Sequence, residues 1–477
     1  YRKYPTSSGS CDGWAGYWPD PLLPKDSFDL AANNTQPFWI TFYVPKGTPA
    51  GNYSGSVKLT ANGKVIKSVP FTVKVWGFDL PVENHSVAVY DGRIDSRWQI
   101  PGQTPEETEH QYWKFMADHR LCPDGVKPEP VLKYENGKVI SDFTEFDKAG
   151  EIYFDKLHLN HTYTPSPFYM FGWGFPPSDH YGEKPYNGEY LYDNLDREIL
   201  RPEYKKVMQA VLKEYWDYMK AKGWDKYVSY YISDEPFYSQ APIIAQMKAL
   251  CKMISEVDPN IKIFSSTWGH VPAWDGYLNM WGIGHFGGVP EEKIKQIKAA
   301  GGFVRFTTDG QMCTDTPYCA IERLLPHYAF KYGADGYEFW GSNWLTYDPY
   351  IFGWHSYIFQ SDTPGKSYYV RYSNGDGFIA YPGGPIGHKG PVPSIRMEQA
   401  REGVEDYEYL YKLSNLIDAA KASGKDVTSA QKALDLANML VDMPSAGGRY
   451  STKILPDPDA VFKVKEAVAK AIEQLSK

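Results

Sequence analysis

Two carboxylic acids, Asp234 and Glu235, stand side by side at the end of an apolar, aromatic stretch, YVSYYISDEP (227–236). When two carboxyl groups are close and partly removed from water, the pKa of one rises, so one stays protonated as an acid while the other stays ionised. Hydrolysis of a glycosidic bond needs this division of labour. The alternative interpretation is structural, because acidic residues also cap the first turn of many helices.

The segments on either side of the pair predict that it ends a strand of a parallel sheet. Amphipathic helices are expected over residues 201–224, closed by Gly223, and over residues 242–257. The apolar run between them is then a strand with crossover helices. Active sites of (β/α)₈ barrels lie at the carboxyl ends of the strands, and Pro236 favours departure from the strand there. Both carboxylates can then face one cavity.

The order of expected strands and helices along the chain predicts a multidomain α/β protein with three regions. Residues 1–83 read as a β-sandwich, with strands expected at 37–45, 52–61 and 68–78 and a hairpin at Asn62-Gly63. Residues 84–393 read as a (β/α)₈, TIM-like barrel, because short apolar runs alternate with helical stretches. Its strands are expected at 86–91, 156–163, 227–234, 261–267, 277–284, 302–308 and 333–342. Residues 394–477 are expected to form helices that close the barrel and pack on it.

Further polar and aromatic side chains recur near the carboxyl ends of the predicted strands. Each one alone is more often a packed ring or a structural histidine than a binding residue. Their recurrence at the same edge of the sheet favours a shared cavity. The candidates for substrate binding are His161, Trp268, His270, Trp281, Glu338 and Trp340.

Composition excludes several other classes of protein. The net charge is −8 with no run rich in Lys and Arg, which argues against a nucleic-acid partner. No apolar stretch is long enough to span a membrane. Five scattered cysteines show no zinc-binding spacing, and no acidic cluster has the pattern of a calcium loop, so no metal or other cofactor is expected. The 15 Trp and 38 Tyr suit either the apolar faces of sugar rings or a large aromatic core.

Four stretches resemble glycoside hydrolase family 123, the β-N-acetylgalactosaminidases, and the wider group that shares its catalytic domain. They are PAGNYSGSVKL (49–59), YYISDEP (230–236), GADGYEFWGSNW (333–344), and GDGFIAYPG (375–383) followed by PSIRMEQAREGVEDYEYLYKL (393–413). The resemblance implies an N-terminal β-sandwich and a (β/α)₈ barrel. It also implies retaining, substrate-assisted catalysis, in which the 2-acetamido oxygen of the substrate attacks the anomeric carbon. Asp234 would orient the acetamido group, and Glu235 would protonate the leaving oxygen.

The function implied by the resemblance is that of an exo-glycosidase that removes terminal β-N-acetylgalactosamine from a glycan or glycoconjugate. The first residues, YRKYPTSSGS, show no signal-peptide pattern. The resemblance alone therefore carries the expectation of a secreted, periplasmic or cell-surface protein.

Two alternatives stay open at the level of sequence. The first is a conventional retaining glycosidase, in which Glu235 is the acid/base and Glu338 or Asp309 is the nucleophile. The second is a carbohydrate-binding protein without catalysis, although a pure binder has no need of the acidic pair.

Overall fold

The structure, a computed structural model, describes residues 20–477 apart from 93, 95, 97, 173–196, 268, 284–290, 309–319, 345–348, 353–355, 360–368, 373–374, 376 and 443–458. The chain forms two compact units, each built from separate stretches of sequence. Unit 1 takes Tyr1–Pro24, Glu83–Val404 and Val441–Ile454, and unit 2 takes Lys25–Val82, Glu405–Leu440 and Leu455–Lys477. The domain boundaries expected at 83/84 and 393/394 stay predictions.

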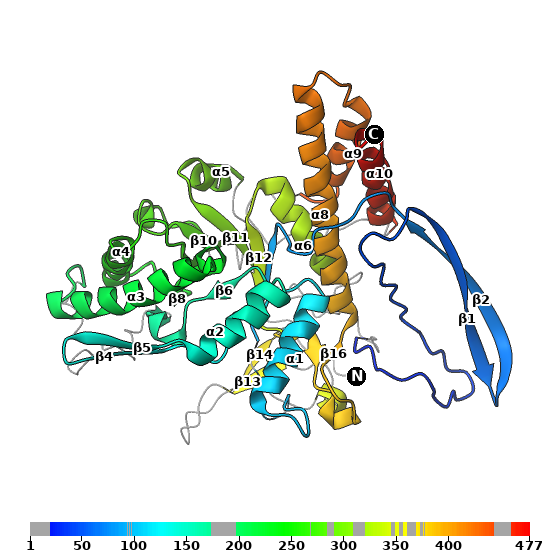
Figure 1. The fold of residues 1–477 in the computed structure, drawn as a ribbon, viewed down its shortest axis with the longest axis horizontal. Helices are drawn as coiled ribbons and strands as arrows, with labels where there is room; N and C mark the ends of the chain where they lie inside the picture. Colours follow the sequence, from blue (N-terminus) through cyan, green and yellow to red (C-terminus); the bar gives the residue numbers. More distant parts are fainter. Residues whose placement is uncertain are drawn as a thin grey trace. The chain divides into compact units, whose positions relative to one another are not determined.

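Unit 1 contains a curled, parallel, TIM-like sheet (Figure 1). Among the described residues it has eight strands, and β7 pairs with β8 beside the main path. The order along that path is β3 (Val87–Tyr90), β12 (Gly336–Phe339), β11 (Phe303–Thr308), β10 (Met280–Ile283), β9 (Ile263–Ser266), β8 (Val228–Asp234) and β6 (Thr162–Tyr163), and β7 spans Phe171–Gly172. The alternation of apolar strands and amphipathic helices therefore predicted the parallel α/β architecture correctly.

The segment 121–124 lies against both edge strands of this sheet. The backbone N–H of Cys122 donates to Ala88 in β3, and the N–H of Tyr90 donates back to Cys122, both at 2.8 Å. On the other side, the N–H of Tyr163 in β6 donates to the carbonyl of Asp124 at 2.7 Å. Backbone hydrogen bonds therefore connect β3 to β6 through this segment.

Two helices of unit 1 have clear local signals at their ends. Helix α1 (Pro105–Asp118) begins with a capping box between Thr104 and Glu107. The Thr104 hydroxyl accepts a hydrogen bond from the N–H of Glu107 at 3.1 Å, and the Glu107 carboxylate accepts one from the N–H of Thr104 at 2.7 Å. Helix α3 (Pro202–Lys222) ends at Gly223, whose φ of +71° suits glycine. The other helices that follow strands or precede them are α2 (Thr144–Gly150), α4 (Ala241–Ser255), α5 (Glu291–Ala299) and α6 (Ala320–Tyr332).

Shorter elements and the C-terminal helices complete the described chain. They are the hairpin β4–β5 (Val131–Glu135, Lys138–Asp142), α7 (Pro349–Phe352), the pairs β13–β14 (Ser356–Phe359, Tyr369–Tyr372) and β15–β16 (Ala380–Tyr381, Val392–Pro393), and helices α8 (Ile395–Ala422), α9 (Thr428–Asn438) and α10 (Ala460–Leu475). In the part of the chain that the structure describes, no helix is both long and apolar enough to cross a membrane.

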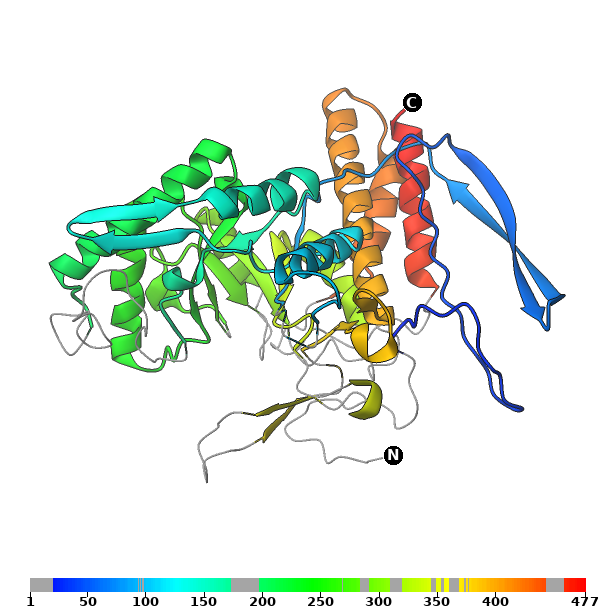
Figure 2. The ribbon, with the colours of Figure 1, turned by 60° about the horizontal axis from the view of Figure 1, so that its bottom comes forward.

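The predicted N-terminal sandwich is wrong for the described residues. Within residues 25–82 the strands are β1 (Gly51–Ala61) and β2 (Lys64–Val75), which form one antiparallel ribbon (Figure 2). The apolar segment 37–45 forms no strand there, although Phe42 packs its ring 4.6 Å from that of Phe71. A sandwich needs a second sheet that buries the facing side chains, and both faces of this ribbon are largely exposed.

The strand predicted over 156–163 is also shorter than expected. A π-helix runs through Glu151–Lys156, and His158 has a φ of +55°. Within 156–163, the residues that pair with β8 are Thr162 and Tyr163. The side-chain amide of Asn160 instead donates hydrogen bonds to the carbonyls of Asn84 and Ser86. These two bonds hold the loop before β6 in place.

Many aromatic side chains are used in packing. At least six tryptophans are 5% exposed or less: Trp98, Trp113, Trp216, Trp224, Trp274 and Trp281. The high aromatic content therefore reflects a large aromatic core in good part.

A buried charged cluster fixes the start of α8 in unit 1. The guanidinium of Arg396 donates to both carboxylate oxygens of Asp20, at 3.2 and 3.0 Å, and to the carbonyl of Gly375 at 2.6 Å. Glu322 of α6 is also buried there, at 1% exposure. Burial raises the pKa of Glu322 to about 7, while the positive charge of Arg396 opposes this shift.

This shift predicts how stability depends on pH. The folded pKa of Glu322 lies above its ordinary value of 4.5, so folding favours the protonated carboxyl group. Its contribution to the free energy of unfolding is therefore fully present below pH 4.5 and is lost as the pH rises through 7. Glu322→Gln cannot ionise. We compare the free energy of unfolding of this variant with that of the native protein. The difference in favour of the variant should grow by about 2 kcal/mol from pH 5 to pH 8. Urea unfolding at both pH values measures this difference. The exposed substitution Glu203→Gln is the control, and an equal change in both variants contradicts the assignment.

Candidate active site

Asp234 is the last residue of β8, and Glu235 begins the turn that leaves the strand. Glu235 has a φ of +41°, in the left-handed region that non-glycine residues rarely adopt. Its backbone N–H still donates to the carbonyl of Ser266 in β9 at 2.8 Å. Neighbouring side chains of a regular strand point to opposite faces, and the turn at Glu235 ends that alternation. Backbone strain of this kind concentrates at functional sites, and both residues are half-buried.

Tyr231 holds the carboxylate of Asp234. The pairing of β8 with β9 shifts register between Tyr231 and Ser233, and the Tyr231 hydroxyl donates to Oδ1 of Asp234 at 3.2 Å. Burial raises the pKa of Tyr231 well above its ordinary value, and the negative charges of Asp234 and Glu338 raise it further. The phenol therefore stays protonated and remains a donor to Asp234.

A second group of side chains surrounds Glu338 of β12, which is 7% exposed. The hydroxyl of Tyr163 in β6 donates a short hydrogen bond to Oε2 of Glu338. Nη1 of Arg305 in β11 donates to the Tyr163 hydroxyl at 3.3 Å and lies 3.0 Å from Nε2 of His161. Burial, and then the charge of Arg305, lower the pKa of His161 well below its ordinary value. His161 is therefore neutral, and Nε2 accepts the hydrogen bond from Arg305.

Aromatic rings join these two groups. The centroids of Tyr163 and Tyr231 are 4.6 Å apart, and Phe264 of β9 lies 5.2 Å from Tyr231. Tyr169 meets Tyr231 edge-on at 5.4 Å, and burial followed by the charge of Asp234 raises the pKa of its hydroxyl. The structure thus brings His161 and Glu338, among the predicted residues, into one connected group with Asp234.

His270 and Trp281 form a separate cluster. Nε2 of His270 lies 2.7 Å from Oδ1 of Asp275, and its ring centroid is 4.9 Å from that of Trp281. Trp281 is 2% exposed and stacks near Trp274 at 6.4 Å. In this arrangement both rings are engaged in packing, and their contact with substrate stays a prediction.

Trp340 connects two of the stretches that resemble family 123. It is half-buried and meets Trp344 at 5.4 Å. Gly377, which has a φ of +83°, lies against it: a Cβ at that position would come within 2.5 Å of the Trp340 ring. Only glycine therefore allows this approach. Trp268 and Asp309, two further candidates, lie outside the described residues.

Sequence patterns missed Tyr163, Tyr231 and Arg305. Arg305 had a readable signal, because a charged residue in the middle of the apolar run GFVRFTT needs a partner if that run is a buried strand. The two tyrosines had none, because tyrosine is common in strands and their partners come from distant strands.

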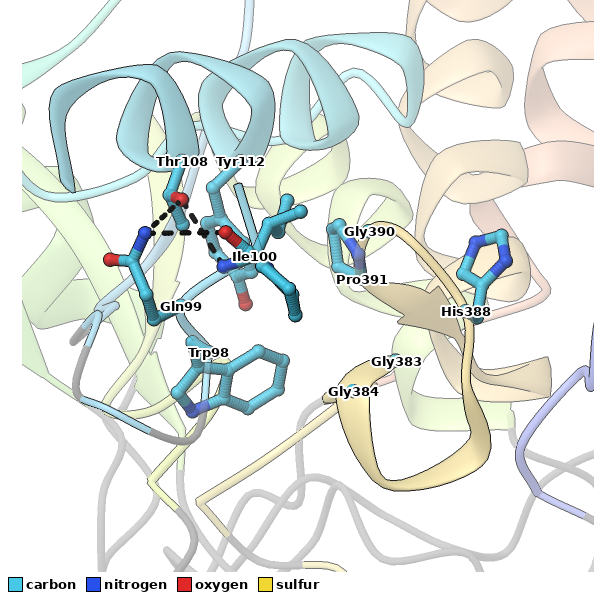
Figure 3. A pocket seen from close by; sticks show the side chains of 11 residues that line it. Trp98, Gln99, Ile100, Thr108, Tyr112, Gly383, Gly384, His388, Gly390 and Pro391 are labelled. Atoms are coloured by element: carbon cyan, nitrogen blue, oxygen red, sulfur yellow. Dashed lines mark hydrogen bonds between the residues drawn. The ribbon is translucent and has the colours of Figure 1, made fainter. Parts of the chain in front are cut away.

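A small recess lies between the start of α1 and the loop 383–391 (Figure 3). Trp98, Ile100, Thr108 and Tyr112 line one side, and the amide of Gln99 donates to the Thr108 hydroxyl at 3.0 Å. The recess has room for about one water molecule, far less than a sugar ring. It is therefore no saccharide site in this conformation. Among the described residues, no group of three His, Cys, Asp or Glu side chains is placed to bind a metal ion.

Comparisons with known proteins agree with the resemblance read from the sequence. A family model for the glycoside hydrolase 123 catalytic domain matches residues 130–413, and a model for the glycoside hydrolase 123 N-terminal domain matches residues 9–61. No curated protein matches.

Two solved structures illustrate the similarity. A family 123 glycoside hydrolase from Clostridium perfringens, studied for glycolipid glycan hydrolysis, has a TM-score of 0.56 at 14% identity, covering 90% of this chain and 76% of its own. A family 39 glycoside hydrolase from Bacteroides cellulosilyticus WH2 has a TM-score of 0.37 at 11% identity, covering 76% and 70%, and carries no argument. The catalytic-domain model covers more than half of the sequence. The chain therefore belongs to glycoside hydrolase family 123 and is a hydrolase that acts on glycosides.

Proposed function

We propose that the protein is a retaining exo-glycosidase that removes terminal β-N-acetylgalactosamine by substrate-assisted catalysis. The observation that carries the proposal is the unequal placement of the two carboxylates at the end of β8. Asp234 is held by the Tyr231 hydroxyl at 3.2 Å, while Glu235 stands in the left-handed turn beyond the strand. A carboxylate at the end of the strand and another in the turn beyond it fit two different roles.

In the proposed first step, the carbonyl oxygen of the 2-acetamido group attacks the anomeric carbon while Glu235 gives its proton to the leaving oxygen. Asp234 accepts a hydrogen bond from the acetamido N–H and stabilises the positive charge that develops on this group. In the second step, Glu235 takes a proton from water, and the water oxygen adds to the anomeric carbon. The bond between this carbon and the acetamido oxygen breaks, which opens the five-membered ring formed in the first step. Two inversions give net retention of configuration.

The conventional alternative has one specific observation in its favour. Glu338 is a buried carboxylate that Tyr163 connects to the ring of Tyr231, so a second carboxylate lies near the group around Asp234. In a conventional retaining enzyme this residue would attack the anomeric carbon, which requires the two carboxyl groups to lie about 5–5.5 Å apart across the sugar.

A thiazoline derived from N-acetylgalactosamine separates the two mechanisms, because it mimics the bicyclic intermediate and not a glycosyl-enzyme. We expect it to inhibit competitively and to bind at least about 100-fold more tightly than N-acetylgalactosamine, as analogues of reactive species do. Inhibition constants for both compounds measure this ratio. Equal affinity for the two compounds would favour Glu338 as the nucleophile.

The sugar is tested by a panel of aryl β-glycosides of N-acetylgalactosamine, N-acetylglucosamine, galactose and glucose. Only the two 2-acetamido sugars are substrates under the proposal, and the first is preferred. Fluorination of the acetamido methyl group provides a second test, because it weakens the carbonyl oxygen as a nucleophile. The rate should fall with each fluorine added. A rate independent of fluorination rules out substrate assistance.

The natural substrate class follows from the same proposal. Glycolipids that end in β-N-acetylgalactosamine are the first candidates, given the subject of the Clostridium perfringens structure. The proposal includes a secreted, periplasmic or cell-surface location, where such glycoconjugates are accessible.

A further inference from the structure

Arg305 is a charged side chain enclosed by the curled sheet, with 1% exposure in the middle of β11. A buried guanidinium is costly unless its N–H groups find partners. Two of its contacts come from β6 and the residue before it, namely His161 and the Tyr163 hydroxyl. The ring of Phe264 lies 5.2 Å from the guanidinium and covers another side of it. Arg305 is therefore a fixed point within the sheet.

Tyr163 joins this fixed cation to Glu338. Its hydroxyl accepts a hydrogen bond from Nη1 of Arg305 and donates one to Oε2 of Glu338. A hydroxyl has one proton to donate, and here it is used for a carboxylate. The three side chains come from three strands, β11, β6 and β12. The position of the Tyr163 ring is thus set by charged groups on both sides of its hydroxyl.

The fixed ring of Tyr163 supports Tyr231. The ring centroids are 4.6 Å apart with the planes tilted by 33°, and the Tyr231 hydroxyl donates to Asp234. A shift of Tyr163 therefore displaces the donor to Asp234. Small misplacements of a catalytic group lower the rate strongly, because the reactive geometry is narrow.

We propose that Tyr163 is a positioning residue for Asp234, acting through Tyr231 and anchored by Arg305 and Glu338. This inference rests on the proposed function only in that Asp234 orients the reacting part of the substrate. The structural alternative is that Tyr163 stabilises the sheet and leaves the reaction unaffected.

The variant Tyr163→Phe keeps the ring and removes only the hydroxyl. We expect kcat to fall about tenfold, the loss of one hydrogen bond to a charged group, with KM changed by less than about twofold. Thiazoline binding should weaken in proportion to kcat, while binding of N-acetylgalactosamine stays unchanged. A purely structural role would alter the unfolding temperature but leave kcat and the relative affinity for the thiazoline and N-acetylgalactosamine unchanged.

Tyr218→Phe is the matched control. Tyr218 of α3 also donates to a carboxylate, that of Asp147 in α2. The same substitution therefore removes the same kind of hydrogen bond, here between two helices. We expect its kcat to equal that of the native enzyme. An equal loss of kcat in both variants would overturn the inference.

A double-mutant cycle with Tyr231→Phe tests the route through Tyr231. If Tyr163 acts through Tyr231, the double variant should lose less than about threefold beyond Tyr231→Phe alone, because the donor to Asp234 is already absent. Losses that multiply independently would contradict this route, as would an unchanged kcat in Tyr163→Phe.

The panel of aryl glycosides keeps this inference separate from the proposed function. Cleavage by the native enzyme of a glycoside without a 2-acetamido group refutes substrate assistance. If the native enzyme cleaves only the 2-acetamido glycosides and the cycle fails, the positioning role of Tyr163 is refuted while the proposed function stands.

Discussion

Glu235→Gln is expected to lower kcat by about 10²–10⁴-fold on glycosides with a poor leaving group, the usual contribution of general acid catalysis. Glutamine has the shape of glutamic acid but no proton to give to the departing oxygen. An activated phenol, such as 2,4-dinitrophenol, departs without protonation. The first step should therefore lose little rate with dinitrophenyl glycosides, which pre-steady-state release of the phenol measures directly.

The leaving-group dependence is what makes this prediction specific. A substitution that merely disturbs the fold lowers the rate for all leaving groups alike. Glu214→Gln on α3 is the matched control, since this carboxylate accepts from the Ser141 hydroxyl at 2.7 Å and lies in the helical layer. If Glu235→Gln hydrolyses alkyl and dinitrophenyl glycosides with equal relative loss, Glu235 is not the acid.

The elements that carry the acidic pair were predictable because their signals are local. The apolar face of α3 and the stop at Gly223 each depend on a few neighbouring residues. The same signals place Asp234 at the end of a parallel strand, as observed. Local patterns succeed where each element is stabilised by contacts that its own periodicity implies.

The structure of the N-terminal region was not predictable in the same way, and the sandwich expected there is wrong. The segment 37–45 has the composition of a strand, but composition does not tell whether a partner strand lies within hydrogen-bonding reach. The ribbon β1–β2 is instead fastened within unit 2 at its end. Glu473 of α10 accepts from the N–H of Gly77 at 2.8 Å, and the ring of Phe78 meets Tyr409 edge-on at 5.1 Å.

The connections around Asp234 were missed for a different reason, although Glu338 was among the predicted candidates. Arg305, Tyr163 and Glu338 lie far apart in sequence, and strand pairing alone decides which side chains meet. The register shift after Tyr231 and the left-handed backbone of Glu235 also leave no readable pattern. A residue before proline favours an extended backbone, so the observed φ of +41° goes against the local preference. Tertiary contacts override local preference here, next to the chemistry.

Asp234→Asn is expected to lower kcat by at least about 10²-fold, since the carboxylate charge that stabilises the developing positive charge is lost. Asparagine still accepts from Tyr231, so the hydrogen bond at 3.2 Å and the fold should persist. The rate loss should grow as fluorine is added to the acetamido methyl group, because a weaker nucleophile depends more on orientation. Initial rates across this substrate series, together with thermal unfolding, measure both effects.

Asp217→Asn on α3 provides the control for this substitution, because Asp217 pairs with Lys213 at 2.6 Å on the exposed side of the helix. It should leave kcat unchanged. Asp234→Asn should also weaken thiazoline binding far more than binding of N-acetylgalactosamine, since the charge acts on the cyclised group. An equal loss of affinity for both ligands would mean that Asp234 contributes equally to binding of the sugar and of the cyclised intermediate. The substrate-assisted role would then have to be abandoned.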